Sequence, residues 1–347
     1  MSTKKFFSQM ALSSFILILI LFLLSPPPSR AAEKVFKWRC QSHWPTASSS
    51  YKDSLIRLSN NLKERTNGRL VVEPYAAESL VPSKEIFNAV KRGMIEIATS
   101  SPGYFRDQIP LAGVASGLPY AFREVWECAY FHKGLGFEKM MQEECAKHGV
   151  YFSTDKVYPT EMCSKKPIRT AADFKGMKIR SSGVLEVFLT SLGAAGAYIP
   201  GPEIYPALAS GVIDAAHWGA VQGSASMGFY DTAKYHIRPG LNIASTDVWL
   251  INQKAIDALP DELKKVLFST LEEQFWFRTT EYEYLEALTL AKIQKGKGVQ
   301  LLVLPPEEQK KMTEAAVKIW DEEAKKSPES GKAVQLMKDF LQKLGHL

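Results

Sequence analysis

The sequence of 347 residues lacks the common signatures of catalysis. It contains no GxSxG nucleophile elbow, no HExxH metal motif, no Walker A loop and no GxGxxG dinucleotide fingerprint. Its six histidines are scattered between His43 and His346 and form no cluster along the chain. Catalytic triads assemble in space, so these absences disfavour an enzyme without excluding one.

Cysteine is scarce, and charge of one sign is nowhere concentrated. The four cysteines, Cys40, Cys128, Cys145 and Cys163, show no CxxC or Cys/His spacing typical of a zinc site. An even number permits one or two disulfides, and buried free thiols are an equal alternative. Basic residues are interleaved with acidic ones, so the composition gives no reason to expect a nucleic-acid partner.

The longest apolar run lies at the N-terminus. Lys4 and Lys5 precede an apolar stretch over residues 11–24, which is followed by three prolines and the small residues Ala31 and Ala32. This pattern is typical of a secretory signal peptide, and its apolar core is shorter than the roughly 20 residues of a membrane span. We therefore predict a signal peptide over residues 1–31, cleavage near Ala31 or Ala32, and a periplasmic protein.

Strand-like and helix-like segments alternate through the rest of the chain, which predicts α/β layers with mainly parallel sheets. Ser50 and Asp53 suggest a capping box at the start of the first helix, and Asn67-Gly68 a left-handed stop at its end. Strands are expected at 35–42, 69–74, 94–101, 150–154, 177–181, 212–218, 247–252 and 299–304, and helices at 51–65, 83–93, 184–192, 203–210, 307–325 and 330–344.

One segment breaks this alternation. Residues 261–295 contain no proline or glycine, and the segment opens with Pro260, Asp261 and Glu262, which favour a helix start. A continuous helix of this length spans roughly 50 Å, more than one small domain. We therefore favour a strut that lies across two domains over two ordinary helices joined near residues 278–280.

A single arginine, Arg180, stands between a predicted strand and the Ser-Ser-Gly turn that opens the next helix. A guanidinium offers two parallel hydrogen bonds to a carboxylate, so an arginine at a strand end suits the capture of an organic acid. Spacing alone favours the commoner arrangement, in which such an arginine pairs with an internal Asp or Glu.

The sequence around Arg180 resembles the solute-binding proteins of tripartite ATP-independent periplasmic (TRAP) transporters, the DctP type. In that family the stretch reads D-x-K-G-x-K-I-R, then a helix and a glycine, then P-x-E-x-Y-x-A-L-x-x-G-x-x-D. The matching residues here are Asp173, Lys175, Gly176, Lys178, Ile179, Arg180, Gly193, Pro202, Glu203, Tyr205, Ala207, Leu208, Gly211 and Asp214. The stretches "TNGRLVVEPY" and "INQKAIDALPDELKKVL" extend the resemblance over the whole mature chain.

The resemblance implies a two-lobed periplasmic binding protein with crossing hinge strands and a long helix spanning both lobes. It places the first lobe at 32–155, the second at 156–244, the return to the first lobe with the long helix at 245–285, and C-terminal helices packed on the second lobe at 286–347. Arg180 takes the position of the arginine that bonds the ligand carboxylate when the lobes close. The implied partners are a small organic acid and the small and large subunits of a TRAP permease, with the protein a monomer or a dimer.

Within the family, "FKWRCQSHWP" and "IDAAHWG" look most like the branch that binds 2-oxo acids and small monocarboxylates. Trp218 matches a tryptophan of that branch, but His217 replaces its metal-binding glutamate, and a second ligand falls near Glu161. No cofactor is required, and Glu161, His217 and Trp218 are candidate ligands for a sodium or calcium ion. Alternatively, His217 bonds the ligand directly, or it is an ordinary strand-end histidine.

Further pocket candidates are aromatic. We expect the cleft to be lined by Tyr104, Tyr158 and Trp44, and its distal end to be lined by Phe229 and Tyr230. Each of these residues is equally compatible with a place in the core. The resulting hypothesis is an exported protein that binds a small organic acid and carries out no reaction. A secreted α/β hydrolase-type enzyme and a periplasmic ligand sensor for a receptor kinase are the alternatives.

Overall fold

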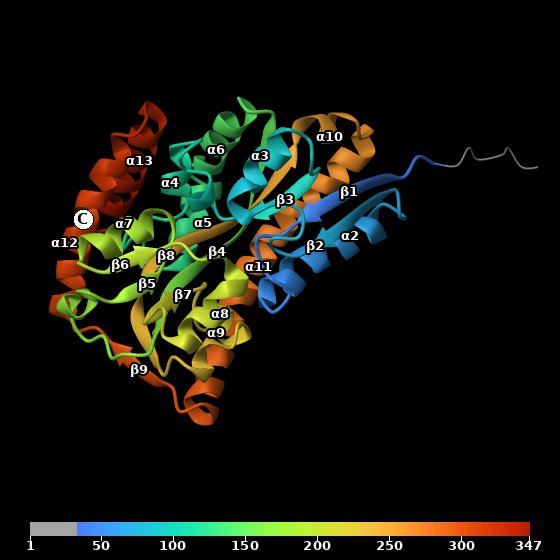
Figure 1. Ribbon diagram of the computed structural model, residues 1–347. Helices are drawn as coiled ribbons and strands as arrows, with labels where there is room; N and C mark the ends of the chain where they lie inside the picture. The colour runs from blue at the N-terminus through green and yellow to red at the C-terminus, as the bar shows by residue number, and fades with distance from the viewer. Residues whose placement is uncertain (1–32) are drawn as a thin grey trace, which may run out of the picture. The chain divides into compact units, whose positions relative to one another are not determined.

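The computed structural model describes residues 33–347; the predicted signal peptide and its cleavage site lie outside the described residues. One mixed sheet organises residues 36–347, with strand order β2-β1-β3-β8-β4-β7-β5-β6 and β9 paired with β8 (Figure 1). Its strands are β1 (Phe36–Gln41), β2 (Leu70–Tyr75), β3 (Ile97–Ser100), β4 (Val150–Ser164), β5 (Lys178–Arg180), β6 (Ala195–Ala197), β7 (Ala215–His217), β8 (Tyr235–Asn252) and β9 (Gln300–Val303).

The sheet consists of two parallel groups joined by two long antiparallel strands. β1 pairs in parallel with β2 and β3, and β5 pairs in parallel with β6 and β7. Between the groups, β8 and β4 pair antiparallel with each other along most of their length. The predicted α/β fold with mainly parallel pairing is confirmed, and β4 and β8 are the crossing strands that the resemblance implied.

Helices cover both faces of this sheet. They are α2 (Arg57–Arg65), α3 (Ile86–Lys91), α4 (Leu111–Ala115), α5 (Val125–Lys133), α6 (Phe137–Ala146), α7 (Gly183–Ser191), α8 (Gly201–Ser210), α9 (Val221–Ser226), α10 (Gln253–Asp257), α11 (Asp261–Gly296), α12 (Pro306–Ala324) and α13 (Pro328–Lys343). Within β8, Val248 and Leu250 enter one core with α3 to α7, α12 and α13, whereas Trp249 and Ile251 enter the other with α2 and α8 to α11. This alternation follows from the two-residue period of a strand.

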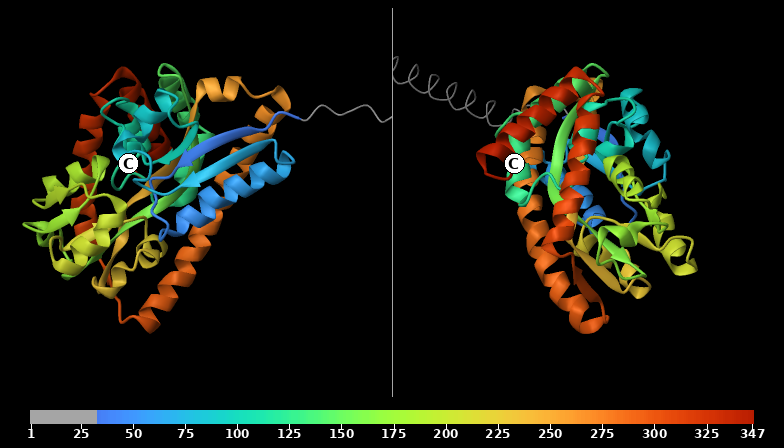
Figure 2. Two further views of the ribbon diagram at one scale, coloured as in Figure 1. Left: turned by 45° about the vertical axis from the view of Figure 1, so that its right-hand side comes forward. Right: turned by 90° about the vertical axis from the view of Figure 1, so that its left-hand side faces the viewer.

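The long segment is one continuous helix, α11, so the alternative of two joined helices is wrong. α11 packs against α2 beside the first parallel group, against the crossing strand β4, and against α9 beside the second group (Figure 2). Thr279 lies in the region where a joint seemed possible, but its hydroxyl accepts a hydrogen bond from the Val157 N–H of β4 at 3.2 Å. The β-branched residue therefore fixes the helix to the sheet instead of ending it.

The first helix begins differently from the prediction. Ser50 already has helical backbone angles (φ −63°, ψ −24°) and makes no capping hydrogen bond, so the capping box with Asp53 is wrong. The turn over Tyr51–Ile56 is a π-helix, which continues into α2. The predicted stop is confirmed, because Asn67 and Gly68 both have positive φ.

The two C-terminal helices, α12 and α13, pack against earlier elements of the chain. α12 packs against α7 and the short turn Ala171–Phe174, whereas α13 packs against α12 and α4.

All four cysteines are buried and unpaired, so the alternative of buried free thiols holds and the alternative of disulfides is wrong. No helix within residues 33–347 is both long and apolar enough to cross a membrane.

Candidate ligand-binding site

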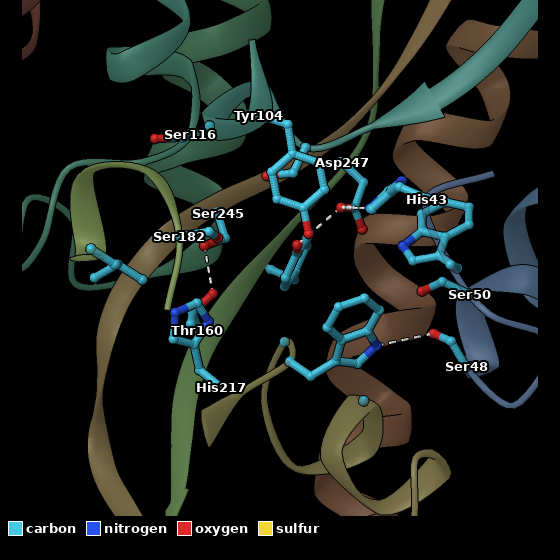
Figure 3. A pocket seen from close by; sticks show the side chains of 18 of the residues that line it. His43, Ser48, Ser50, Tyr104, Ser116, Thr160, Ser182, His217, Ser245 and Asp247 are labelled. Carbon is cyan, nitrogen blue, oxygen red and sulfur yellow. Dashed lines mark hydrogen bonds and ion pairs between the residues drawn. The ribbon is translucent and has the colours of Figure 1, made fainter. Parts of the chain in front are cut away.

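A pocket lies where β4 and β8 pass between the two parallel groups (Figure 3). It holds about 660 Å³ of empty space, a figure that includes open solvent at its mouth. Six of the predicted site residues line it: Trp44, Tyr104, Tyr158, Arg180, His217 and Trp218. The pocket is also lined by Thr160, Ser245 and Asp247 of the crossing strands and by Tyr282 of α11.

Arg180 occupies the last position of β5, and only 2% of its surface is exposed. Its guanidinium donates to the carbonyl oxygens of Ile199 and His217, both at 3.1 Å, and to the Tyr104 hydroxyl at 3.3 Å. None of these partners is charged, and none of the ion pairs found among residues 33–347 includes Arg180. Arg180 therefore does not pair with an internal Asp or Glu, which was the commoner arrangement expected from spacing alone.

The sheet explains how Arg180 and His217 meet. β5 and β7 are parallel neighbours, so their final residues lie at the same edge of the sheet. The His217 side chain is 6% exposed, and its Nε2 lies 2.9 Å from the Ser181 hydroxyl. Burial and the Arg180 charge lower the pKa of His217 to about 3, so the imidazole is neutral near pH 7.

Aromatic rings from both parallel groups surround Arg180. The Trp218 ring centroid lies 5.2 Å from the guanidinium carbon, and Trp218 Nε1 donates to the Ser48 hydroxyl at 3.3 Å. Tyr198, which sequence reasoning missed, follows β6 and meets Tyr104 edge to face at 5.3 Å. The Lys84 ammonium lies 4.2 Å above the same Tyr198 ring. The position directly after a parallel strand was the signal that could have identified Tyr198.

A buried ionic network at the crossing strands also escaped the sequence analysis. Asp247 of β8 accepts from Lys156 of β4, from Tyr158 at 3.1 Å, and lies 3.1 Å from His43 Nε2. Lys156 also contacts Asp155 at 3.3 Å. Burial alone would raise the pKa of Asp247, but the Lys156 charge and His43 lower it well below its usual range. Figure 3 shows His43 and Asp247 directed toward each other beside Tyr104.

Trp44 and Tyr158 form a wall over this network. Their ring centroids lie 4.6 and 5.0 Å from the Lys156 ammonium, within the range of a cation–π interaction. Trp44 is only 3% exposed. Both residues therefore combine a packing role with a place at the pocket, and the two interpretations left open by the sequence are compatible.

The structure contradicts the prediction for Glu161. Thr160 lines the pocket, but Glu161 does not. The Glu161 carboxylate instead lies 2.7 Å from His236 Nε2 and 3.0 Å from the Arg238 guanidinium. Phe229 and Tyr230 are likewise absent from the pocket lining: both are buried in the core, with the Tyr230 hydroxyl 2.7 Å from His236 Nδ1.

The residues proposed for an ion do not form a cation site. Within residues 33–347, no three His, Cys, Asp or Glu side chains are grouped so that they could hold a metal ion. Glu161 is outside the pocket, His217 Nε2 faces Ser181, and both oxygens of Asp247 have partners of their own. The expected donor set of Glu161, His217 and Trp218 is therefore not assembled in the pocket.

A mixed α/β fold with two parallel groups, long crossing strands and a ligand pocket between them is that of a periplasmic-type solute-binding protein. The chain belongs to the DctP family, bacterial extracellular solute-binding protein family 7, whose model matches residues 41–327. The family predicted from the sequence is thereby confirmed. Members of this family are receptors that bind a solute for transport and are not enzymes.

Similarity to individual proteins agrees with this assignment. A monocarboxylate 2-oxoacid-binding periplasmic protein of Nostoc sp. is 26% identical over 293 residues, covering 84% of this chain and 80% of the relative. A solute-binding protein of Albidiferax ferrireducens is 24% identical over 289 residues, covering 80% of each chain.

Solved structures confirm the two-domain fold. A TRAP solute-binding protein of Bordetella bronchiseptica, a dimer with calcium and picolinate, has a TM-score of 0.83 at 24% identity, covering 90% of this chain and 93% of the other. One of Pseudoalteromonas atlantica with sodium and pyruvate has a TM-score of 0.82 at 24% identity, covering 90% and 95%. An ion accompanies the ligand in both of these neighbours.

Proposed function

We propose that this chain captures a small monocarboxylate in the periplasm and delivers it to the small and large membrane subunits of a TRAP permease. The observation that carries the proposal is the buried, acid-free guanidinium of Arg180 at the pocket. A buried charge without a counter-ion is costly, and a carboxylate ligand would offset that cost with charge-assisted hydrogen bonds. The named ligands of relatives, 2-oxo acids and pyruvate, support this class.

We further propose that closure of two lobes encloses this acid. The first lobe runs to residue 155, the second covers 156–244, residues 245–285 return to the first, and residues 286–347 are C-terminal. The C-terminal helices were expected on the second lobe; α12 does pack on α7 there, whereas α13 packs on α4, which belongs to the first lobe under these boundaries. Tyr104 and Arg180 then come from different lobes, so their hydrogen bond forms only in the closed state. A ligand that bonds Arg180 favours closure because only the closed state surrounds it.

The experiment is calorimetric titration of the mature protein, refolded to remove copurified ligand, with acetate, pyruvate, L-lactate and 2-oxobutyrate. Wild-type protein is expected to bind at least one of these acids. Arg180→Met should weaken that binding by at least about 2 kcal/mol, roughly 30-fold, because it removes the charged partner.

A matched control is Arg123→Met, a change at an arginine that does not line this pocket. It should leave the affinity for the same acid unchanged. Equal affinity in Arg180→Met and wild-type protein would contradict the proposed role of Arg180, and failure of every acid to bind would contradict the proposed ligand class.

A further inference from the structure

The pocket offers few free acceptors for a cation. Asp247 is the one carboxylate among the described residues that line it, and that side chain already contacts Lys156, His43 and Tyr158. Glu161 does not line the pocket and is held by His236 and Arg238. A cation entering beside the ligand would therefore meet hydroxyl and carbonyl oxygens without a free carboxylate.

Arg180 makes such a cation still less favourable. A positive charge placed near a buried guanidinium is repelled by it, and the low dielectric of the site strengthens that repulsion. A protein carboxylate beside the cation would offset this repulsion, but Arg180 has only carbonyl and hydroxyl partners. The fixed charges of the site therefore suit an anion alone.

His217 supplies a neutral polar group instead. Its Nε2 lies within hydrogen-bonding distance of the Ser181 hydroxyl. Its Nδ1 has no hydrogen-bond partner among the described residues, and it is not fully buried. His217 lines the pocket, and its backbone carbonyl oxygen accepts from the Arg180 guanidinium. One ring nitrogen is thus available close to the group that would hold a carboxylate.

We infer that this pocket binds its ligand without a bridging cation, and that His217 Nδ1 takes a second oxygen on the carbon next to the ligand carboxylate. The inference rests on the proposed function. The ligand class is a small monocarboxylate with a 2-hydroxy or 2-oxo group. Nδ1 accepts from a hydroxyl in one tautomer and donates to a keto oxygen in the other, so both chemistries fit the same position.

The cation is tested by titrating the mature protein with pyruvate and with L-lactate in a potassium buffer containing a chelator, then with calcium or sodium added. The affinity for the bound acid should change by less than about twofold in either cation, apart from general salt screening. Elemental analysis of the acid-loaded protein after dialysis against calcium should find much less than one calcium ion per chain.

Binding that occurs only with calcium or sodium, or retention of one calcium ion per chain, would overturn the cation-free site while leaving the monocarboxylate function intact. Failure of pyruvate, L-lactate and 2-oxobutyrate in every buffer would overturn the 2-oxygenated class, and failure of acetate and propionate as well would reject the proposed function. These results are distinguishable because the function requires binding in some buffer, whereas the inference requires it in the buffer that lacks both ions.

The role of His217 is tested by comparing pyruvate or L-lactate with propionate, which has no second oxygen. His217→Ala should weaken binding of the oxygenated acid by about tenfold, the value of one hydrogen bond of roughly 1.4 kcal/mol, and leave propionate unchanged. His217→Asn retains a donor and an acceptor and should recover part of the loss. His148→Ala, outside the pocket, is the control histidine.

Equal weakening for propionate and the oxygenated acid would mean that His217 only supports the pocket wall. An unchanged affinity for the oxygenated acid would also reject the contact. Melting temperatures of the variants, measured without ligand, show whether a loss of binding reflects a loss of folded protein.

Discussion

Burial controls the charge state of two histidines, His217 and His132. Burial and a neighbouring cation, Arg180 for His217 and Lys133 for His132, lower the pKa of each imidazole from 6.5 to about 3. In the unfolded chain both accept protons below about pH 6.5, whereas in the folded protein neither does so until about pH 3. Their contribution to stability is therefore complete above pH 6.5 and is lost as the pH falls toward 3.

We expect the free energy of unfolding to fall by roughly 2 kcal/mol per histidine between about pH 7 and pH 5, from these two groups alone. Urea unfolding at the two pH values measures the change. His132→Gln removes one titrating group and should make the dependence shallower. A pH dependence that is identical in the variant and the wild type would mean that His132 does not contribute.

Arg180 illustrates a conflict between binding and stability. Its charge is buried without an acidic partner, so Arg180→Met removes a desolvation penalty along with the ligand contact. Stability without ligand should be unchanged or raised by up to about 4 kcal/mol, in contrast to the loss of binding. Thermal unfolding in the absence of acids provides the measurement; a clear decrease in melting temperature would show that the carbonyl contacts of Arg180 are structural.

Sequence reasoning identified the residues whose position at a strand end is local information. Arg180 and His217 end strands, and the pocket contains both. It failed for Glu161 because sequence alone does not fix which side chains of a strand face a pocket, and β4 is irregular on both sides of Thr160. It missed the pair Lys156 and Asp247 because these residues are far apart in sequence and meet only when β4 and β8 pair.

At the scale of elements, the crossing strands are longer than their sequence suggested. The predictions covered 150–154 and 247–252, whereas β4 has 15 residues and β8 has 18. Their missing portions contain polar residues and prolines, which weaken a strand pattern. The polar residues include Thr160 and Ser245, which line the pocket, so the features that obscured the strands belong to the site.

The ion network on these strands should contribute strongly to stability. Lys156 is fully buried between Asp155 and Asp247, and replacing it with methionine would leave two buried carboxylates without their cation. Lys156→Met is expected to lower the free energy of unfolding by about 3 to 5 kcal/mol. Chemical denaturation tests this value, and Lys166→Met, at a surface ion pair, is the matched control with an expected change below about 1 kcal/mol.

Two glycines meet between the turn Pro102–Tyr104 and the start of α7. A Cβ atom added to Gly103 would lie 3.1 Å from the Gly183 Cα, and one added to Gly183 would lie 3.2 Å from the Gly103 Cα. If the proposed lobes separate without ligand, Gly103→Ala should disturb the closed state more than the open one. We expect roughly tenfold weaker binding of the captured acid, about 1.4 kcal/mol, with little change in unliganded stability.

Calorimetric titration of Gly103→Ala tests this contact. Gly296→Ala is the control, because a Cβ there meets no atom within 4 Å. Wild-type affinity in Gly103→Ala would show that the two backbones do not limit closure.

Within residues 36–347, α11 links the two parallel groups that the crossing strands separate. It contacts α2, β4 and α9, and its Glu286 carboxylate accepts from the Val221 and Gln222 N–H groups at 2.7 and 2.8 Å. A helix of 36 residues attached at both ends limits the directions in which the proposed lobes can move. Hinge motion concentrated in β4 and β8 is therefore the expected form of closure.

Small-angle X-ray scattering provides the corresponding measurement. Saturation with a binding acid should lower the radius of gyration toward the value of about 20 Å expected for a compact chain of this size. Arg180→Met should show no decrease at the same concentration of acid. An unchanged radius in wild-type protein that binds the acid by calorimetry would contradict closure by lobe movement.

The four unpaired cysteines make local opening of this protein observable by thiol chemistry. Cys40 on β1 and Cys163 near the end of β4 belong to one core, and Cys128 and Cys145, on α5 and α6, belong to the other, so the two pairs sample the two cores of the fold. Burial raises the pKa of the Cys163 thiol to about 12, and burial with Glu144 does the same for Cys145, so neither forms a reactive thiolate while it stays enclosed. Each labelling rate therefore reports how often its own neighbourhood opens, and slowing by ligand would map which regions the bound acid holds shut.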